Sequence, residues 1–569
     1  MTTTPSSHTE EGTHPVADQI PDPTRSPVVP VADAINTIAL TKCQDTEHRI
    51  HFRRAERVES LTLAELDGRA RRVAGRLYEL GVRARDRVGI MAPNRIEWVL
   101  LDLAVLKLGA VTAGIEPGRY RPERILDEFG LTLLFVEGGA LGQVRDIAEV
   151  ITWAEETGLE GSGTEGFEGG GFDGPALGEG YDPADICAIK QTSGSTGVPK
   201  GIEATTASVN QSIAAVQEMF DHRDGDNLMV FLPVRFLQQR YWIYSALVHG
   251  HDVTLADRIT VLEVAKATAP TVVMGVPGFY EQLKARVEAA GPVADPAARC
   301  AAVQTELGGR IRYLWTGSAP AGRAMLDFFN DCGVPLYEGY GLNETCIVSK
   351  NHPGAARVGS VGKVLPHKRI RFDKDGILIV GTTHPVNTRY TWCGPGANEK
   401  TYLPTGEVRT FDIGHVDEDG FLYIDGRVDD IVTLSGALNI LVPLVEERLR
   451  ELPGIHDCAV FGDGKPYLTA VVSPAAPGTD QQALARSVSE LNDRLRYEQR
   501  IYGVVVASEQ FSIENGLLNA QYKLVRSQIA KRYGDDLDLV HQKHRVYNDG
   551  TVTGVDVLVT AAAEGTEEA

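Results

Sequence analysis

The sequence predicts an α/β protein with a large N-terminal domain of layered sheets and helices and a small α+β C-terminal domain. Up to Arg427, apolar strands alternate with amphipathic helices, which is typical of sheets covered by helices. Beyond Arg427 the pattern changes to short hydrophobic strands and helices. At roughly 100–200 residues per domain, the 569 residues predict three or four packing units. We therefore expect the large domain over 31–427, the small domain over 428–569, and a disordered start over 1–30.

The first elements can be placed in order from their boundary signals. Thr62 predicts a helix N-terminus because Glu65 completes a capping box, and Gly81 is expected to end that helix. A strand over 87–91, a helix over 94–109 and another strand follow, and this order indicates parallel pairing. Later segments are expected as strands over 186–191, 227–232, 271–275 and 311–316, a Gly/Glu-rich surface loop over 157–182, and a hairpin over 547–559 before an acidic tail.

The composition argues against several classes of partner. A formal net charge of −21 disfavours binding to nucleic acid or an anionic membrane, since both require basic surfaces. The longest apolar stretch, 99–111, contains Asp102 and Lys107 and is too short to span a bilayer. The seven cysteines form no CxxC pair, which is typical of reduced thiols in a cytoplasmic protein. We expect a cytoplasmic enzyme whose anionic ligand meets a local concentration of positive charge.

The strongest motif is TSGSTGVPKG, which spans 192–201 after an apolar strand. Closely spaced glycines allow backbone N–H groups to approach phosphate oxygens, while hydroxyls and a lysine add donors and positive charge. A flexible linker is the alternative interpretation. The Pro-Lys-Gly ending and the preceding strand favour the phosphate site. Its predicted phosphate-binding residues are Thr192, Ser193, Gly194, Ser195, Thr196, Gly197 and Lys200.

This loop resembles the signature loop of the acyl-adenylate-forming superfamily, which includes acyl-CoA synthetases, firefly luciferase and the adenylation domains of peptide synthetases. Four later segments, YEGYGLNET, GSVGKVLP, DEDGFLYIDGR and VFGDGKPYLTAVV, are similar to those of bacterial long-chain acyl-CoA synthetases. The resemblance covers nearly the whole folded chain. It implies an ATP-dependent, AMP-forming ligase that binds Mg²⁺, uses CoA as co-substrate, and moves its small C-terminal domain between two half-reactions.

The resemblance also implies how the nucleotide is held. Tyr340 would stack on adenine, with Gly341 and Asn343 beside it. Asp412 would accept hydrogen bonds from both ribose hydroxyls, as one carboxylate can from a diol, and Arg427 would contact ribose and phosphate. The strand end that borders adenine and the acyl group would consist of Gly317, Ser318 and Ala319.

Catalytic roles follow from the same resemblance. Glu344 and Thr196 would hold Mg²⁺, which prefers hard oxygen ligands. Lys523, in NGLLNAQYKLVR, would bridge an oxygen of the acid and the α-phosphate during adenylation. Lys200 and Glu344 complete the predicted catalytic set. Asp429 matches the hinge position about which the small domain would rotate.

The acid-binding side departs from the superfamily pattern. Long-chain synthetases have a histidine in an LPLxH segment, whereas Leu232-Pro233 is followed here by Val234, Arg235 and Phe236. The polar run continues through Gln238, Gln239 and Arg240, and we expect these side chains at the surface, where such residues more often lie. We doubt a long-chain fatty acid and favour a small or polar acid. The predicted substrate pocket comprises Arg235, Phe236, Gln239 and Gly317.

Three other functions compete with acid transfer to CoA. The protein would activate nitrite with ATP and couple it to an aromatic amine, a diazotisation found in natural-product pathways of secondary metabolism, or it would load an acyl group onto a carrier protein. The non-enzymatic alternative is a degenerate ligase that acts as a scaffold. A scaffold has no reason to retain all five functional residues in register, namely Lys200, Glu344, Asp412, Arg427 and Lys523.

Overall fold

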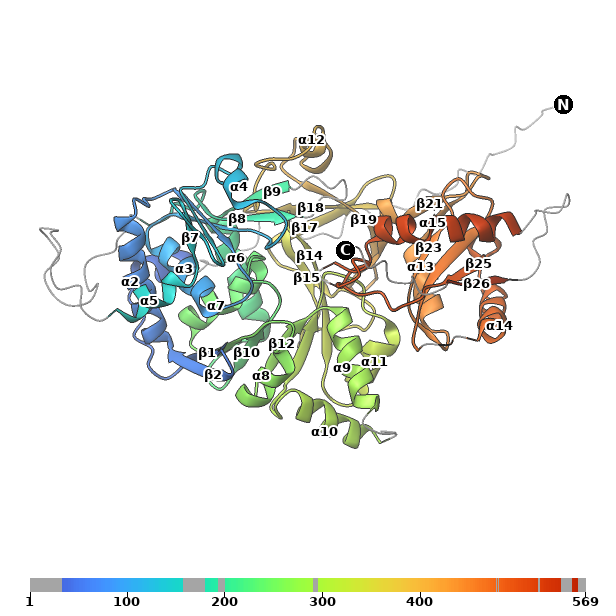
Figure 1. Cartoon of the computed structure of the whole chain (residues 1–569), viewed down its shortest axis with the longest axis horizontal. Helices are drawn as coiled ribbons and strands as arrows, with labels where there is room; N and C mark the ends of the chain where they lie inside the picture. Colours follow the sequence, from blue (N-terminus) through green and yellow to red (C-terminus); the bar gives the residue numbers. More distant parts are fainter. Residues whose placement is uncertain are drawn as a thin grey trace, which may run out of the picture.

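The computed structural model describes residues 33–156, 180–192, 200–289, 295–476, 478, 480–519, 522–543 and 555–560. The predicted disordered start, nearly all of the Gly/Glu-rich loop and the end of the acidic tail lie outside these ranges. Within the described part, the chain forms a large N-terminal domain of several sheets and a smaller C-terminal domain (Figure 1).

Two large sheets form the frame of the N-terminal domain. A 7-stranded sheet has the order β6-β7-β5-β3-β4-β8-β9, and a 9-stranded sheet has the order β16-β15-β14-β13-β12-β10-β11-β1-β2. The first sheet contains β3 (Arg87–Met91), β4 (Val111–Gly114), β5 (Leu133–Val136), β6 (Ala140–Leu141), β7 (Val144–Asp146), β8 (Ile186–Thr192) and β9 (Lys200–Thr205). The second contains β1 (Arg49–Arg54), β2 (Arg57–Thr62), β10 (Asn227–Val230), β11 (Asp252–Leu255), β12 (Val272–Gly275), β13 (Tyr313–Thr316), β14 (Leu336–Leu342), β15 (Cys346–Lys350) and β16 (Lys363–Val364).

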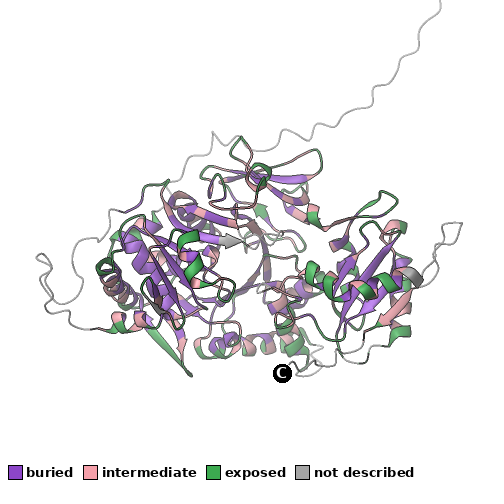
Figure 2. Ribbon diagram, turned by 45° about the horizontal axis from the view of Figure 1, so that its top comes forward, coloured by how far each residue is buried: buried purple, intermediate pink, exposed green. Residues whose placement is uncertain are grey.

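Helices on both faces bury these sheets. The main hydrophobic core joins strands of both sheets to helices between them, and every residue of α3 is buried there. The core helices are α1 (Ala34–Leu40), α2 (Leu63–Glu79), α3 (Ile96–Lys107), α5 (Glu149–Glu155), α6 (Thr206–Phe220) and α7 (Leu237–His249). The outer faces are covered by α4 (Pro122–Glu128), α8 (Val261–Thr268), α9 (Pro277–Ala289), α10 (Pro296–Glu306) and α11 (Arg323–Asp331). Exposed residues gather on the peripheral helices and loops (Figure 2).

A third sheet leads into the C-terminal domain. Its order is β17-β18-β19-β20, and the last domain carries a sheet of order β23-β24-β25-β26 with helices on both faces. The first group comprises β17 (Lys368–Phe372), β18 (Ile377–Thr382), α12 (Ala397–Thr401), β19 (Val408–Val416) and β20 (Leu422–Arg427). After η1 (Val428–Asp430) follow β21 (Ile431–Thr433), β22 (Asn439–Leu441), α13 (Val442–Arg450), β23 (Ile455–Phe461), β24 (Leu468–Pro474), α14 (Gln481–Asn492), η2 (Tyr497–Gln499), β25 (Ile501–Val506), α15 (Arg526–Lys543) and β26 (Asp556–Val559).

Local sequence patterns correctly predicted the positions of several helices and strands. The capping box of Thr62 and Glu65 is formed at the start of α2. The predicted strand over 87–91 is β3, and it pairs in parallel with β4 across α3. The end of the predicted hairpin over 547–559 forms β26, which pairs in parallel with β25. The stretch 544–554 lies outside the described ranges, so the hairpin stays a prediction. No described helix has both the length and the apolar character needed to cross a membrane.

The expectation that the polar run 235–240 lies at the surface is wrong. Arg240 is 1% exposed and Gln239 is 6% exposed, because α7 packs inside the main core. Arg240 donates to Asp102 on α3 at 2.8 Å, and the Tyr244 hydroxyl donates to the other carboxylate oxygen at 2.6 Å. The ion pair and the additional hydrogen bond from Tyr244 together offset the cost of removing both charges from water.

Replacing Arg240 with Met is expected to destabilise the N-terminal domain by about 3–5 kcal/mol, because Asp102 is left buried without its counter-charge. Denaturant unfolding followed by tryptophan fluorescence measures this loss. The double variant Arg240→Met with Asp102→Leu should lose less stability than the single one. Arg323→Met, which breaks an exposed pair with Asp327 on α11, is the control and should change little. An Arg240→Met protein as stable as the wild type contradicts the prediction.

Candidate active site

A buried carboxylate, paired with a partly exposed arginine, lies where the third sheet meets β14. Asp412 on β19 and Arg427 on β20 are cross-strand partners, and their side chains form an ion pair of 2.8 Å. The Tyr340 hydroxyl donates to the second oxygen of Asp412. Asp412 is 3% exposed, and its burial raises the pKa of its carboxyl against the opposing effect of Arg427. A carboxylate fixed in this way can accept hydrogen bonds from a ribose diol.

Phe411 holds the backbone beside this carboxylate in an unusual conformation. Its φ of 63° lies in the left-handed region that favours glycine. A bulky residue in that region is strained by about 1–3 kcal/mol, and such strain is characteristic of functional sites. Phe411 therefore holds a glycine-like backbone geometry directly before Asp412.

Lys523 lies on a turn of the C-terminal domain that faces the same pair. Its backbone N–H donates to Asn519 Oδ1 at 3.1 Å. The side chain of the preceding Tyr522 rests on Gly278 of α9, where an added Cβ atom would come within 2.6 Å of the Tyr522 Cβ atom. Burial, followed by the charge of Arg427, lowers the pKa of the Lys523 ammonium, while Asp412 opposes this effect. The ammonium forms no ion pair with any described residue, so it is available to a ligand.

Glu344 and Lys200 both contact Tyr390, Glu344 at its hydroxyl and Lys200 at its ring. The Tyr390 hydroxyl donates to Glu344 Oε1 at 2.7 Å, and the Lys200 Nζ atom lies 4.8 Å from the centre of the Tyr390 ring. Tyr390 was not predicted as a site residue, since no short-range sequence pattern indicates that the stretch 381–403 folds over β9. Backbone hydrogen bonds between Gly201 and the pair Thr391 and Trp392 hold that stretch in place.

The phosphate-binding loop is only partly described. Thr192 ends β8, and its backbone is paired with that of Lys200 on β9, so the two ends of the loop lie side by side. The proposed phosphate ligands between them lie outside the described residues, and their role stays a prediction. They are Ser193, Gly194, Ser195, Thr196 and Gly197.

The small-residue strand end follows β13 and lies against β14. A Cβ atom on Gly317 would come within 3.0 Å of the Gly339 carbonyl oxygen, and Ser318 has a φ of 72°. Gly341 is equally constrained, because a Cβ atom there would meet the Cys346 carbonyl oxygen at 2.2 Å. These glycines are therefore required for close backbone packing whether or not a ligand is present. Ala319 and Asn343 lie in the same two turns and are partly exposed.

The donor set around Glu344 fits Mg²⁺ in an ATP complex. The described residues contain no group of three or more metal-ligating side chains. Mg²⁺ in nucleotide sites is usually held by one or two carboxylates together with phosphate oxygens and water. Glu344 supplies a carboxylate of the required kind, and Thr196 lies outside the described ranges.

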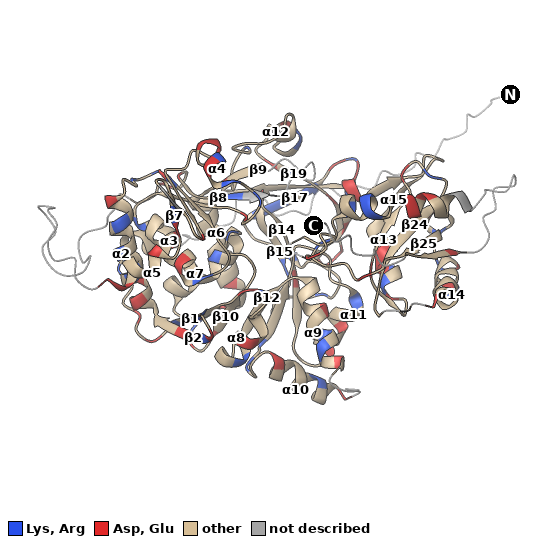
Figure 3. Ribbon diagram, in the orientation of Figure 1, with Lys and Arg blue, Asp and Glu red and all other residues tan. Residues whose placement is uncertain are grey.

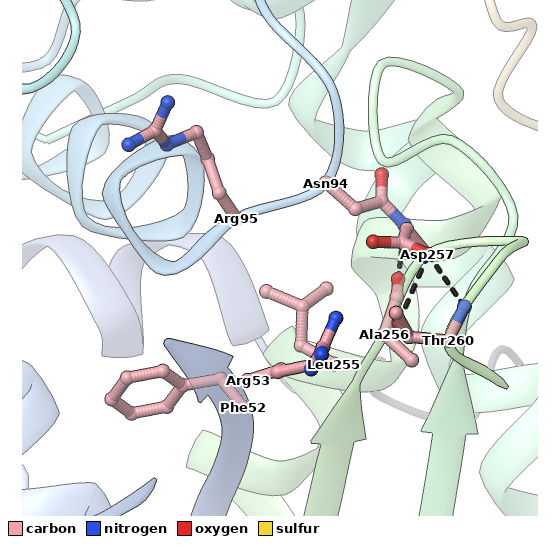
Figure 4. Close-up of a pocket in the computed structure, with 8 residues that line it drawn as sticks. All are labelled: Phe52, Arg53, Asn94, Arg95, Leu255, Ala256, Asp257 and Thr260. Atoms are coloured by element: carbon pink, nitrogen blue, oxygen red, sulfur yellow. Dashed lines mark hydrogen bonds between the residues drawn. The ribbon is translucent and has the colours of Figure 1, made fainter. Parts of the chain in front are cut away.

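The acid pocket of Arg235, Phe236, Gln239 and Gly317 stays a prediction. Arg235 forms an ion pair of 2.9 Å with Glu116 and stacks over Phe236 at 4.3 Å, and Gln239 faces the core with its carbonyl oxygen unpaired. No described interaction joins these residues to Gly317. A separate pocket of about 20 Å³ between β1, β11 and the start of α3 has room for little more than one water molecule. Figure 4 shows that it is lined by residues outside this site, with Asp257 bonded to Thr260.

Three lysines near this site are buried, and nothing in the sequence had indicated their burial. Lys190 contacts Cys346 Sγ at 3.7 Å, and Lys368 donates to the Thr345 carbonyl at 2.8 Å. Burial acts to raise the pKa of the Cys346 thiol, but the charges of Lys190 and Lys368 outweigh it and lower that pKa. The third, Lys350, ends β15. Basic positions on β8, β15 and β17 are blue in Figure 3.

Asp429 lies in η1 and is exposed, two residues after Arg427. Its neighbour Asp430 pairs with Arg526 at 3.3 Å, and Arg526 also holds Glu446 at 2.7 Å. The chain between the domains is thus anchored one residue after Asp429. Its role as a hinge stays a prediction.

In this two-domain fold, the buried carboxylate of Asp412 faces Lys523 of the second domain, the arrangement that the resemblance predicts for an AMP-forming ligase. The chain belongs to the AMP-binding enzyme family, whose sequence profile matches residues 40–378, and the profile of the AMP-binding enzyme C-terminal domain matches residues 429–545. Members of this family use ATP, and the curated relatives named below are ligases that join acids to CoA.

Named relatives differ in their acids. The long-chain-fatty-acid–CoA ligase FadD15 of Mycobacterium bovis is 27% identical over 570 residues, which covers 85% of this chain and 92% of that protein. The 2-succinylbenzoate–CoA ligase of Bacillus cereus is 25% identical over 71% of this chain and 81% of its own length. Among solved structures, ATP-bound MatB from Rhodopseudomonas palustris shares the fold with a TM-score of 0.72 at 21% identity, covering 89% of this chain and 99% of that one.

Proposed function

We propose that the protein adenylates a small or polar carboxylic acid with ATP and transfers the acyl group to the thiol of CoA. The observation that carries this proposal is the position of Lys523 beside the pair of Asp412 and Arg427. In the first step, the acid's carboxylate oxygen attacks the α-phosphorus and pyrophosphate leaves. In the second step, the thiol sulfur attacks the acyl carbon and AMP leaves.

The residues of the chain act mainly by positioning and charge. Asp412 binds the ribose, which fixes the α-phosphate relative to the acid. The Lys523 ammonium neutralises the negative charge of the approaching carboxylate and phosphate, an effect that is strong in a site shielded from water. Mg²⁺, held by Glu344 and Thr196, would neutralise charge on the phosphates.

The choice of a small or polar acid rests on the core beside the nucleotide site. Trp242, Trp315 and Phe220 occupy the space between α7 and β15, and buried lysines lie among the same elements. Bulky rings and buried cations suit a short anionic ligand better than an acyl chain. The long-chain substrate in the name of one relative is therefore not transferred to this protein.

Nitrite is the second candidate, because it is a small anion and Lys190 is fully buried with a thiol as its described partner. In that reaction a nitrite oxygen would attack the α-phosphorus and release pyrophosphate. An aromatic amine would then attack the activated nitrogen, AMP would leave, and loss of water would give the diazo group.

Detection of AMP by mass spectrometry tests both functions. The purified protein is given Mg-ATP with a panel of carboxylic acids, with and without CoA, and separately with nitrite and an aromatic amine. AMP that forms with an acid and increases with CoA supports the ligase. AMP that appears only with nitrite and the amine replaces the ligase with diazotisation. An acyl group that is transferred only to a phosphopantetheinyl protein identifies a carrier as acceptor, and no AMP under any condition favours the scaffold.

A further inference from the structure

Lys350 is a buried cation without a counter-charge. It is 1% exposed, and its cross-strand partner is Gly339, next to Tyr340 on β14. Its ammonium has neither a carboxylate within ion-pair distance nor a hydrogen-bond acceptor in the described part of the chain. An ammonium group placed in the core without such a partner is strongly disfavoured. A buried lysine with no structural partner therefore calls for another explanation.

Three aromatic rings surround this ammonium. The Lys350 Nζ atom lies 3.8 Å from the ring centre of Trp315, 4.0 Å from that of Phe220 and 5.2 Å from that of Trp242. We call these four residues the aromatic box. Ring faces stabilise a cation only in part. The Nε1 atoms of Trp242 and Trp315 are also buried without any hydrogen-bond partner. The box thus combines one ammonium with two unpaired indole donors and supplies no acceptor.

The aromatic box adjoins the strand end that was predicted to border the acyl group. Trp315 precedes Thr316 and Gly317 on β13, and its indole lies 3.9 Å from the position of a Cβ atom on Gly317. The Nε1 atom of the same indole lies 2.7 Å from the position of a Cβ atom on Gly339. A ligand that extends from Gly317 away from the nucleotide site would meet the Trp315 ring first and Lys350 behind it.

We propose that the aromatic box binds a second carboxylate, so that the substrate is a dicarboxylic acid whose other carboxylate is adenylated. This inference deepens the proposed function and rests on it. The second carboxylate would accept hydrogen bonds from the Lys350 ammonium and from the two indole N–H groups. Charge-assisted bonds of this kind are the strong ones in a site with little water.

The electrostatics of the aromatic box agree with this arrangement. Burial lowers the pKa of Lys350 well below its ordinary value. Burial also lowers the pKa of His222, which contacts Trp242, to about 2, and lowers the pKa of His352, which contacts Phe220. Both imidazoles are therefore neutral near pH 7, so they add no further positive charge beside Lys350. An anion in the box would restore the charge of Lys350.

Matched acid pairs test the inference. Butyrate is compared with glutarate, and benzoate with isophthalate, by ATP–pyrophosphate exchange with wild type and Lys350→Met. We expect the wild type to prefer the dicarboxylate of each pair. In the variant this preference should fall by about 10–100-fold, which corresponds to the loss of one or two hydrogen bonds to a charged group. Lys350→Met should remain folded and gain thermal stability, because a buried ammonium is replaced by an apolar side chain of similar size.

Two tryptophan variants sharpen the test. Trp242→Phe keeps an aromatic ring but removes an unpaired indole donor of the box, so it should lose part of the preference. Trp98→Phe is the matched control. Trp98 is also buried, and its Nε1 atom has no hydrogen-bond partner among the described residues. It lies on α3, where it contacts Arg240 of α7, so its replacement should leave the preference for the dicarboxylate unchanged.

Calorimetric binding of glutarate and isophthalate, in the presence of a non-reacting ATP analogue, separates this inference from the proposed function. Exchange with the monocarboxylates but without a preference that depends on Lys350 overturns the inference and leaves the ligase intact. Binding of a dicarboxylate that depends on Lys350, without any exchange, supports the box and contradicts the ligase. Absence of binding by both dicarboxylates overturns the inference.

Discussion

The Lys523→Ala protein is expected to adenylate at least about 10²–10³-fold more slowly than the wild type, the range found when one charge-stabilising group is removed from an enzyme site. The physical reason is that its ammonium faces Asp412 and Arg427 without a described ion pair, so its charge is free to act on the reacting oxygens. The turn that carries Lys523 is held by backbone contacts with Asn519 and by Tyr522 on Gly278. The fold should therefore survive the substitution.

Separate assays of the two half-reactions measure this effect. ATP–pyrophosphate exchange reports adenylation, and CoA consumption with a chemically prepared acyl adenylate reports the second step. Only the first should collapse in Lys523→Ala. Lys531→Ala, on the exposed face of α15, is the control and should retain both activities. Normal exchange by Lys523→Ala would show that another residue carries the charge.

The adenylation rate should also depend on the protonation of Lys523. Burial and the nearby Arg427 lower its pKa, and the protonated form is the one that neutralises charge. Adenylation should consequently decline as the pH rises through this lowered pKa, at a lower pH than an ordinary lysine would require. In Lys523→Ala the residual rate should lack this alkaline decline. A pH–rate profile of pyrophosphate exchange measures both.

Replacing Asp412 with Ala is expected to raise the KM for ATP by about 100-fold or more, since two hydrogen bonds from the ribose to a charged acceptor are lost. The change also leaves Arg427 without its partner and frees the Tyr340 hydroxyl. Steady-state pyrophosphate exchange over a range of ATP concentrations gives the value.

Asp417→Asn provides the control for Asp412→Ala. Asp417 follows the end of β19 and pairs with Arg357 near the surface, so its replacement should leave the KM for ATP unchanged. A circular dichroism spectrum of Asp412→Ala that matches the wild type would exclude unfolding as the cause. If the KM for ATP were unaltered in a folded Asp412→Ala protein, the ribose would be bound elsewhere.

The sequence alone was enough to predict the nucleotide side of this protein. Tyr340, Asp412, Arg427 and Lys523 lie in short, contiguous motifs that resemble those of the superfamily, so their roles could be predicted without knowing the fold. The helix that starts at Thr62 and the strand over 87–91 were also predictable, because capping and hydrophobic periodicity act between near neighbours.

The tertiary structure alone decided which polar residues are buried and what they meet. Arg240 was expected at the surface, but its partner Asp102 lies far away in the sequence on α3, and no local pattern joins them. The contact between Tyr390 and Glu344 depends in the same way on a loop that folds back over β9. Lys350 reads as an ordinary lysine at the end of a strand, and only the packing of Phe220, Trp242 and Trp315 around it makes it a buried cation. Burial depends on contacts between distant segments, and a local sequence pattern does not record those contacts.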